Sequence, residues 1–234
     1  MILMHVLSYY LSKRITVAID GPAGAGKSTL ARRIAAKLGY LYIDTGAMYR
    51  AVALWALRTK VASGDMHRLE QLANEARIEF GPDSNAVFLN GEDVTQAIRT
   101  PEVGEVASKI SSIPAVRRAL VSKQRVFGEH ASVVMDGRDI GSVVFPDATI
   151  KIFLDAQPEE RTERRAQELS LPVDVVAQQI HDRDRRDRTR VESPLVQAPD
   201  AVYVDTTRLS IDEAEAALLK LIRDRTSNGK ERTH

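Results

Sequence analysis

Short apolar runs alternate with longer amphipathic stretches along most of the chain. Five of these runs carry the side chains of buried strands: 15–20, 41–44, 132–136, 150–155 and 201–205. Between them, apolar residues recur at helical spacing, which predicts helices over 27–38, about 47–57, 116–127, 158–169, 173–186 and 211–223. This alternation predicts an α/β fold, a parallel sheet flanked by helices.

One segment breaks the alternation. Between residues 60 and 113, two helical stretches (about 66–76 and 102–110) flank three short strand patterns at 77–80, 86–90 and 92–94. Asn90-Gly91 between the last two favours a tight hairpin. A small antiparallel sheet does not belong in a parallel core. We therefore expect an inserted subdomain at about 60–113, a core of 15–59 and 114–225, an N-terminal extension at 1–14 and a polar tail at 226–234.

Composition narrows the class of protein without naming its activity. The 234 residues carry 33 Lys and Arg against 32 Asp and Glu, so no surface for a nucleic acid polymer is expected overall. The absence of cysteine excludes disulfides and cysteine-based metal or nucleophile sites, and is compatible with a reducing cytosol. No apolar stretch reaches the roughly 18 residues of a membrane span, and residues 1–14 lack the basic start and cleavage site of a signal peptide. We expect a soluble protein that does not enter a membrane.

Residues 21–28 read Gly-Pro-Ala-Gly-Ala-Gly-Lys-Ser, a complete G-x-x-x-x-G-K-S phosphate loop between a strand and a helix. Its glycines let backbone N–H groups surround a phosphate chain at the positive end of a helix. Lys27 can reach the β- and γ-phosphates, and the Ser28 hydroxyl can ligate Mg²⁺. A glycine-rich turn with a surface lysine is the alternative, but the strand–loop–helix context favours a nucleoside triphosphate site of the P-loop NTPase type.

Two further motifs follow strand ends, where α/β sheets bind ligands. Residues 44–50, Asp-Thr-Gly-Ala-Met-Tyr-Arg, offer a hydroxyl, a phenol and a guanidinium to a second phosphate, although Asp44 or Thr45 could simply cap a helix and Tyr49 could pack. In residues 135–141, Asp136 is positioned to hold Mg²⁺ as a Walker-B carboxylate does. Arg138 and Asp139 would project into the same crevice. The alternative is a plain turn in which Asp139 neutralises Arg138.

Residues 181–190 hold five arginines and three aspartates, preceded by Arg161, Arg164 and Arg165. Such a run is usually a solvated helix laced with ion pairs. Helical spacing, however, gathers Arg183, Asp187 and Arg190 on one face and Arg185 and Arg188 on another. Beside a phosphate loop, this excess of positive charge favours a mobile lid over about 161–190 that contacts two phosphate groups.

This set of groups fits phosphoryl transfer to a phosphate acceptor. A phosphate monoester has a second pKa of about 6, so its attacking oxygen is ionised near neutral pH and needs no general base. Repulsion between the two polyanions is then the obstacle, and arginines counter it. A hydroxyl acceptor would instead want a carboxylate base. A kinase for UMP or a hydroxyl substrate and a non-catalytic nucleotide-binding module remain alternatives, whereas the N-K-x-D and L-S-G-G-Q motifs of GTPases and ABC ATPases are absent.

Four stretches, residues 19–29, 44–50, 135–147 and 182–194, resemble bacterial cytidylate kinases, and the resemblance runs from about residue 15 to 223. Asp136–Gly141 followed by Val-Val-Phe-Pro-Asp is highly specific to that family, whereas the phosphate loop alone is not. The resemblance implies a monomeric, cytoplasmic (d)CMP kinase of pyrimidine nucleotide metabolism that uses ATP and Mg²⁺ to make CDP or dCDP. It also implies that the inserted subdomain binds the acceptor.

The same resemblance assigns individual residues. ATP would contact Gly21, Pro22, Ala23, Gly24, Ala25, Gly26, Lys27, Ser28 and Thr29, and Mg²⁺ would be held by Ser28 and Asp136. The acceptor phosphate would contact Thr45, Tyr49, Arg50 and Arg138, the cytosine Ser108, Arg117 and Asp139, and the ribose Arg183 and Asp187, with Arg190 among the phosphate-facing groups. The expected catalytic set is Lys27, Arg138, Arg183, Arg188 and Arg190. The N-terminal extension is unusual for the family, and the connector at 169–173 is a few residues short.

Overall fold

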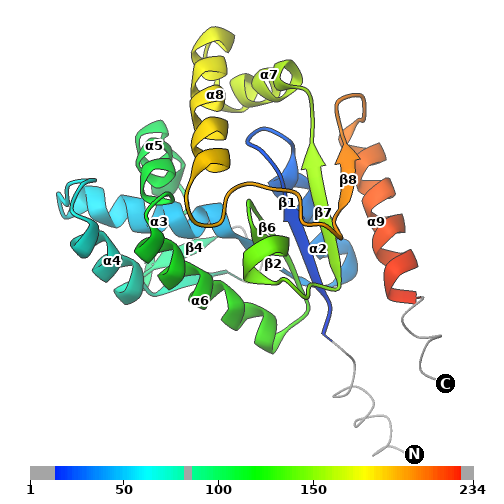
Figure 1. Cartoon of the computed structure of the whole chain (residues 1–234), viewed down its shortest axis with the longest axis horizontal. Coiled ribbons are helices and arrows are strands. Elements are labelled where there is room, and N and C mark those ends of the chain that lie inside the picture. The colour runs from blue at the N-terminus through cyan, green and yellow to red at the C-terminus, as the bar shows by residue number, and fades with distance from the viewer. Residues whose placement is uncertain (1–13, 82–85, 228–234) are drawn as a thin grey trace, which may run out of the picture.

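The computed structural model describes residues 14–81 and 86–227. Its centre is a five-stranded parallel sheet with the strand order β2-β6-β1-β7-β8 (Figure 1). The strands are β1 (Thr16–Asp20), β2 (Leu41–Asp44), β6 (Val133–Gly137), β7 (Ile150–Asp155) and β8 (Val202–Asp205). Every neighbouring pair in this sheet is parallel, so the predicted α/β architecture is confirmed, with strand bounds within about one residue of those expected.

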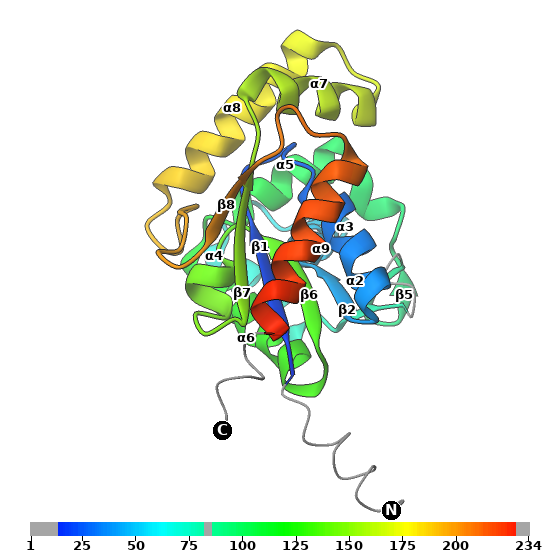
Figure 2. The same ribbon diagram turned by 90° about the vertical axis from the view of Figure 1, so that its right-hand side faces the viewer.

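Helices cover both faces of the sheet. On one face, α2 (Lys27–Leu38) and α9 (Ile211–Ser227) pack over an apolar cluster that includes Val17 and Ile19 of β1 (Figure 2). On the other, α3 (Thr45–Arg58) and α6 (Pro114–His130) cover a second cluster that includes Ala18 of the same strand. Side chains of β1 thus alternate between two cores, as a strand buried on both faces requires.

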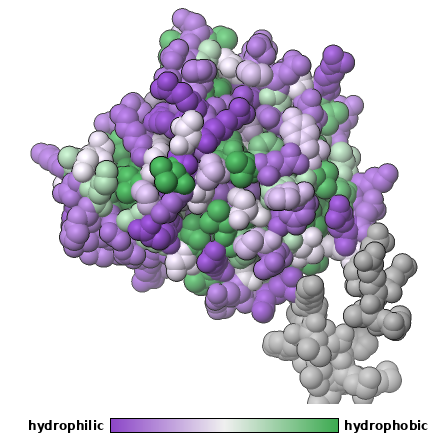
Figure 3. All heavy atoms as spheres, in the orientation of Figure 1, coloured by the Kyte–Doolittle hydropathy of each residue, from purple (hydrophilic) through white to green (hydrophobic). Residues whose placement is uncertain are grey.

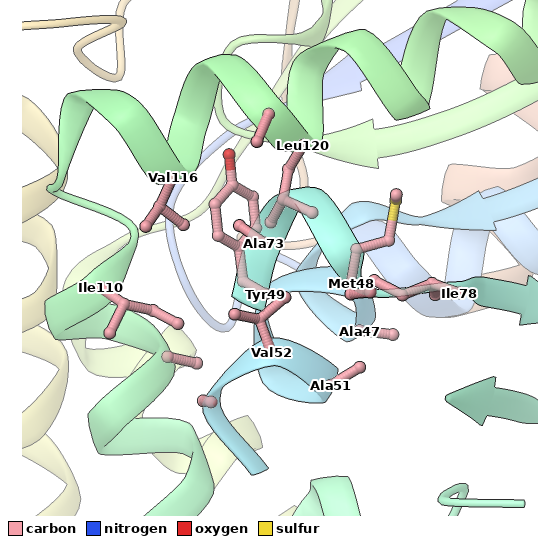
Figure 4. Packing of buried hydrophobic residues seen from close by; sticks show 14 of the residues in the cluster. Ala47, Met48, Tyr49, Ala51, Val52, Ala73, Ile78, Ile110, Val116 and Leu120 are labelled. Atoms are coloured by element: carbon pink, nitrogen blue, oxygen red, sulfur yellow. The ribbon is translucent and has the colours of Figure 1, made fainter. Parts of the chain in front are cut away.

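The segment that breaks the alternation forms its own three-stranded antiparallel sheet. Its elements are α4 (Met66–Glu75), β3 (Ile78–Phe80), β4 (Val87–Leu89), β5 (Glu92–Asp93), η1 (Ala97–Arg99) and α5 (Pro101–Ile110). Asn90 and Gly91 both have positive φ, 52° and 86°, as a tight hairpin turn demands. Apolar side chains of this segment, among them Ile78 and Ile110, pack with Met48, Val52 and Leu120 of α3 and α6 (Figure 4). The small sheet is therefore held against the main sheet by one shared core.

Two helices project beyond the carboxyl ends of the strands (Figure 1). They are α7 (Pro158–Leu169) and α8 (Val173–Thr189), which pack on each other through Ala166, Val176 and Ile180. Three residues join them, and Ser170 in the joint adopts a positive φ of 53°. The region of these helices at the top of the molecule is largely hydrophilic (Figure 3). The predicted arginine-rich helix therefore exists, on a two-helix projection near the phosphate loop.

One short element was not expected from the sequence. Ile140–Val144 forms a π-helical turn, η2, directly after β6 and the residues Arg138 and Asp139.

Across residues 14–81 and 86–227, no helix combines the length and the apolar character needed to cross a bilayer.

Candidate active site

The phosphate loop, residues 21–28, connects β1 to α2 at the carboxyl edge of the sheet. Gly24 and Gly26 have left-handed backbone, with φ of 78° and 84°. A Cβ on Gly24 would lie 2.6 Å from the carbonyl oxygen of Arg161, and one on Gly21 would lie 1.9 Å from that of Leu154. Only glycine fits both places. The first turn of α2 carries no acidic residue, so the positive end of the helix is available to an anion.

Lys27 lies within this loop and is only 6% exposed. Its Nζ donates to the carbonyl oxygen of Pro22 at 2.6 Å. Burial and the charge of nearby Arg138 together lower the pKa of Lys27 to about 7. A buried ammonium held next to other cations is stabilised when an anion arrives.

Ser28 and Asp136 come together as expected. The Ser28 hydroxyl donates to Asp136 Oδ2 at 2.8 Å, and the Tyr42 hydroxyl donates to Oδ1 at 2.9 Å. Burial raises the pKa of Asp136 to about 6, helped by the charge of Asp44 on the adjacent strand. These oxygen ligands suit Mg²⁺, although no cluster of three or more His, Cys, Asp or Glu side chains that could hold a metal occurs in the described residues. The protein thus offers a hydroxyl and a carboxylate, a donor set that suits an ion bound mainly by phosphates and water. Tyr42 was missed because its strand position reads as a packing residue.

On the acceptor side, Asp44 is the N-cap of α3, where it accepts from Ala47 N at 2.8 Å and from Arg50 Nη2 at 2.7 Å. The capping alternative is therefore correct for Asp44. Thr45 instead donates its hydroxyl to the Asp136 carbonyl at 2.7 Å.

Tyr49 is buried under α6, and the Arg117 guanidinium lies 5.5 Å from its ring. Burial raises the pKa of Tyr49 to about 12. Its hydroxyl has no hydrogen-bond partner among the described residues.

Arg117 and Asp139 form a buried ion pair, Nη2 to Oδ2. Arg117 Nη1 also donates to the Ser111 carbonyl at 3.1 Å, and Arg190 Nη2 lies 3.8 Å from Asp139 Oδ1. Ser108, on the neighbouring helix α5, is buried, and its hydroxyl lacks a partner within the described part of the chain. Buried polar atoms without partners are uncommon in folded proteins and need an explanation such as a bound ligand or water.

Arg138 has a different partner from Asp139. Its Nε donates to Asp187 Oδ2 at 2.8 Å, and Asp187 also lies 3.7 Å from Arg190. Although burial opposes its charge, Arg138, Arg183 and Arg190 together lower the pKa of Asp187. The alternative interpretation, a plain turn in which Asp139 neutralises Arg138, is therefore wrong. Arg138 is paired with Asp187 and Asp139 with Arg117, both distant in the sequence.

One face of helix α8 contacts Arg138 and the phosphate loop through Asp187 and Asp184. Burial, together with the charge of Arg138, lowers the pKa of Arg183 to about 10. Burial and the charge of Arg117 also lower the pKa of Arg190. Arg188 and Arg185 lie on the exposed face. The structure thus brings Arg183, Asp187 and Arg190 to Arg138 and leaves Arg188 apart from them.

Two residues of the predicted lid to which the sequence assigned no individual role join these helices to the phosphate loop. Arg161 Nη1 donates to the Ala23 carbonyl at 3.0 Å and to Asp184 Oδ2 at 2.6 Å. Asp184 Oδ1 in turn accepts from Ala23 N at 3.4 Å. Both side chains are buried, so α7 and α8 grip one residue of the loop from its two backbone polar groups.

Comparison with known proteins relates the chain to one family. A family model described as cytidylate kinase matches residues 17–224. The chain is 62% identical over 226 residues to a cytidylate kinase of Solibacter usitatus, covering 94% of this chain and 97% of that protein. It is 46% identical over 220 residues to a cytidylate kinase of Ligilactobacillus salivarius, covering 91% and 98% respectively.

A solved structure shares the fold at much lower identity. A gluconokinase from Sinorhizobium meliloti gives a TM-score of 0.52 at 14% identity, with coverage of 95% of this chain and 100% of that one. This likeness concerns the fold alone.

Proposed function

The chain belongs to the cytidylate kinase family, and on this premise we propose that it transfers the γ-phosphoryl group of ATP to CMP or dCMP, giving ADP and CDP or dCDP. The observation that carries the proposal is a cluster of cations beside the phosphate loop, formed by the buried Lys27 and the partly buried Arg138 and Arg183. Lys27 lies beside Arg138 and Arg183, and the pKa of both Lys27 and Arg183 is lowered by burial and by Arg138. Such a concentration of positive charge is suited to two phosphorylated ligands.

The acceptor chemistry needs no catalytic base. A nucleoside monophosphate presents an ionised oxygen near neutral pH, and guanidinium groups reduce its repulsion from ATP. Asp187 is paired with Arg138 and Asp139 with Arg117, so we assign neither carboxylate as a base. We therefore favour a phosphate acceptor, contacted by Thr45, Tyr49, Arg50 and Arg138.

Recognition of the base follows from the pair Arg117–Asp139. A carboxylate accepts from the N4 amino group of cytosine, where uracil presents a repelling O4 oxygen. A guanidinium can donate to the N3 and O2 edge, and the unpartnered Ser108 hydroxyl adds a further polar group. Arg183 and Asp187 are the proposed ribose contacts.

On the donor side, Gly21 to Thr29 would bind the ATP phosphates. Ser28 and Asp136 would hold Mg²⁺, which when bound neutralises charge on the β- and γ-phosphates. Their hydroxyl and carboxylate oxygens fit that ion. Arg183, Arg188 and Arg190 would neutralise the remaining negative charge on the transferring phosphoryl group. Arg188 is exposed and would have to approach that group as a lid over 161–190 closes. Residues 60–113 would form the acceptor-binding part.

We further propose that the protein works as a monomer in the cytoplasm, with nucleotides rather than nucleic acid polymers or membranes as partners. Its near-balanced charge, net +1, supports the part of this proposal that excludes nucleic acid polymers. Size-exclusion chromatography with light scattering tests it; a stable dimer at micromolar concentration would contradict the monomer.

The decisive test is ADP release from ATP with CMP, dCMP, UMP and AMP as acceptors, with an acceptor-free reaction as the background. CMP and dCMP should be turned over with a kcat/KM roughly 30- to 1000-fold above that of UMP, the range that unpaired buried polar groups can impose. Equal use of UMP would replace the proposal with a general pyrimidine kinase. Nucleotide binding without ADP release above background would indicate a non-catalytic module.

A further inference from the structure

Asp20 is the last residue of β1 and immediately precedes the phosphate loop, yet its side chain points at another part of the site. Its Oδ1 accepts from the backbone N–H of Ile140, and its Oδ2 accepts from that of Gly141, each at 2.7 Å. The residue is 5% exposed. Hydrogen bonds from two N–H groups to one carboxylate are strong and define the position of both donors.

Those two N–H groups belong to the residues that follow Arg138 and Asp139. Ile140 and Gly141 begin η2, so their N–H groups have no partner earlier in that turn. On the other side, Gly137 is the end of β6 and pairs in register with Asp20 itself. Arg138 and Asp139 therefore lie between two points, both fixed by Asp20.

The opposite end of η2 is held by α6. Arg125 Nε donates to the Val144 carbonyl at 3.0 Å, and its Nη2 donates to the Val143 carbonyl at 2.8 Å. Residues 140–144 are thus clamped by a carboxylate at the amino end and by a guanidinium at the carboxyl end.

Burying a carboxylate at position 20 costs free energy, which argues that Asp20 has a role that an apolar residue could not fill. Burial raises the pKa of Asp20 to about 7, with the charge of Asp139 acting in the same direction and the two N–H groups and Lys27 opposing it. An apolar residue would avoid this cost but would leave two buried N–H groups unpaired.

We propose that Asp20 is a positioning residue for acceptor recognition: together with Arg125 it fixes the η2 turn and thereby aims Arg138 at the acceptor phosphate and Asp139 at the base. Because the main chain of Asp20 leads directly into the phosphate loop, the same residue also fixes the position of the acceptor-binding groups relative to the donor site. This inference rests on the proposed function.

The test is Asp20→Asn, which keeps the shape and one acceptor oxygen but turns an amide NH₂ toward the second N–H. We expect the kcat/KM for CMP to fall roughly 10- to 100-fold, the effect of losing a strong buried hydrogen bond. The CMP:UMP ratio of kcat/KM should fall as well, by about fivefold or more, because Asp139 is displaced. The KM for ATP should change by less than about twofold. The affinity for CMP, measured by calorimetry in the absence of turnover, should fall.

Glu215→Gln is the matched control. Glu215 is another buried carboxylate, but it pairs with Arg33 and Lys37 between α9 and α2, away from the acceptor residues. It should lower the melting temperature and leave the CMP:UMP ratio unchanged. Arg125→Met, at an exposed residue of α6, removes the other clamp and should lower the same ratio by a smaller factor in a folded protein.

The inference fails if Asp20→Asn lowers only the melting temperature, or if CMP and UMP lose activity in equal proportion. If Asp20→Asn does not fold, an unchanged CMP:UMP ratio in Arg125→Met overturns it. These outcomes are read only after the unmodified protein prefers CMP over UMP. If it does not, the proposed function fails and the clamp is not the cause.

Discussion

Asp139 is held by Arg117 and not by Arg138, and this pairing shapes what its substitution should do. In Asp139→Asn the remaining carbonyl oxygen accepts from Arg117, so the NH₂ group faces the base, where it can donate to O4 of uracil but meets the N4 amino donor of cytosine. The CMP:UMP ratio of kcat/KM should therefore fall by roughly 30-fold or more, with CMP losing and UMP keeping most of its activity. Steady-state kinetics with both acceptors measures this ratio.

The matched control is Glu192→Gln, which changes an exposed carboxylate paired with Arg118 at 2.9 Å. Its CMP:UMP ratio should equal that of the unmodified protein. A proportional loss for both nucleotides in Asp139→Asn would mean that Asp139 acts on Arg117 alone and does not contact the base.

Lys27 offers a second residue-scale prediction. Lys27→Met keeps the length of the side chain and removes the charge beside the transferring phosphoryl group, so turnover should fall by roughly 10³-fold. Because burial lowers the pKa of Lys27, its charge is unfavourable in the folded protein without nucleotide. The melting temperature should therefore stay equal or rise, as a thermal melt would show.

Lys37→Met is the control for that substitution, since Lys37 lies on the same helix, is exposed and pairs with Glu215. It should retain full turnover. Turnover in Lys27→Met close to that of the unmodified protein would remove Lys27 from the donor site.

At the scale of elements, α7 and α8 are poorly anchored by apolar contacts. Among the described residues, the cluster between them has three buried side chains, with Leu169 and Leu171 partly buried beside it. Polar contacts of Arg161 and Asp184 with Ala23 tie the two helices to the phosphate loop. Segments with small cores open readily. We expect hydrogen exchange over residues 161–190 to slow markedly when a bisubstrate analogue binds, while β1 and β6 keep their protection.

Protection of 161–190 that is the same with and without the analogue would contradict a closing lid. In that case α7 and α8 would form a fixed wall of the crevice, and the exposed Arg188 would have no route to a phosphate.

At the scale of the whole molecule, carboxylate–arginine pairs join α8 to the residues after β6 and so make stability depend on pH. Arg138, Arg183 and Arg190 outweigh burial and lower the pKa of Asp187, so its ionised form stabilises the fold above the unfolded pKa of about 4. This stabilisation is lost as pH falls through the lower pKa of the folded state. The melting temperature should decline steeply on acidification below about pH 4.

Asp187→Asn isolates this contribution. The difference in melting temperature between the two proteins should be largest near pH 7 and shrink as the pH falls below about 4 toward the lowered pKa of the folded state, below which Asp187 is protonated in both states. A difference that stays constant over that range would show that the charge of Asp187 does not stabilise the fold.

The sequence by itself determined the parallel sheet, the phosphate loop and the Asn90-Gly91 hairpin. Each depends on local information: apolar periodicity, a glycine spacing and the backbone freedom of two turn residues. Ser108 and Arg117 have no such local signal, since each lies on an ordinary amphipathic helix. Only the resemblance to a known family singled them out.

The tertiary structure alone decided the partners. Asp20 bonds to Ile140 and Gly141, more than a hundred residues away, because β1 and β6 are neighbours in the sheet. The pairs Arg117–Asp139 and Arg161–Asp184 arise in the same way, where helices pack at the carboxyl edge of the strands. A charge run gives the number of arginines but not which of them are buried, because burial depends on the elements that fold against them.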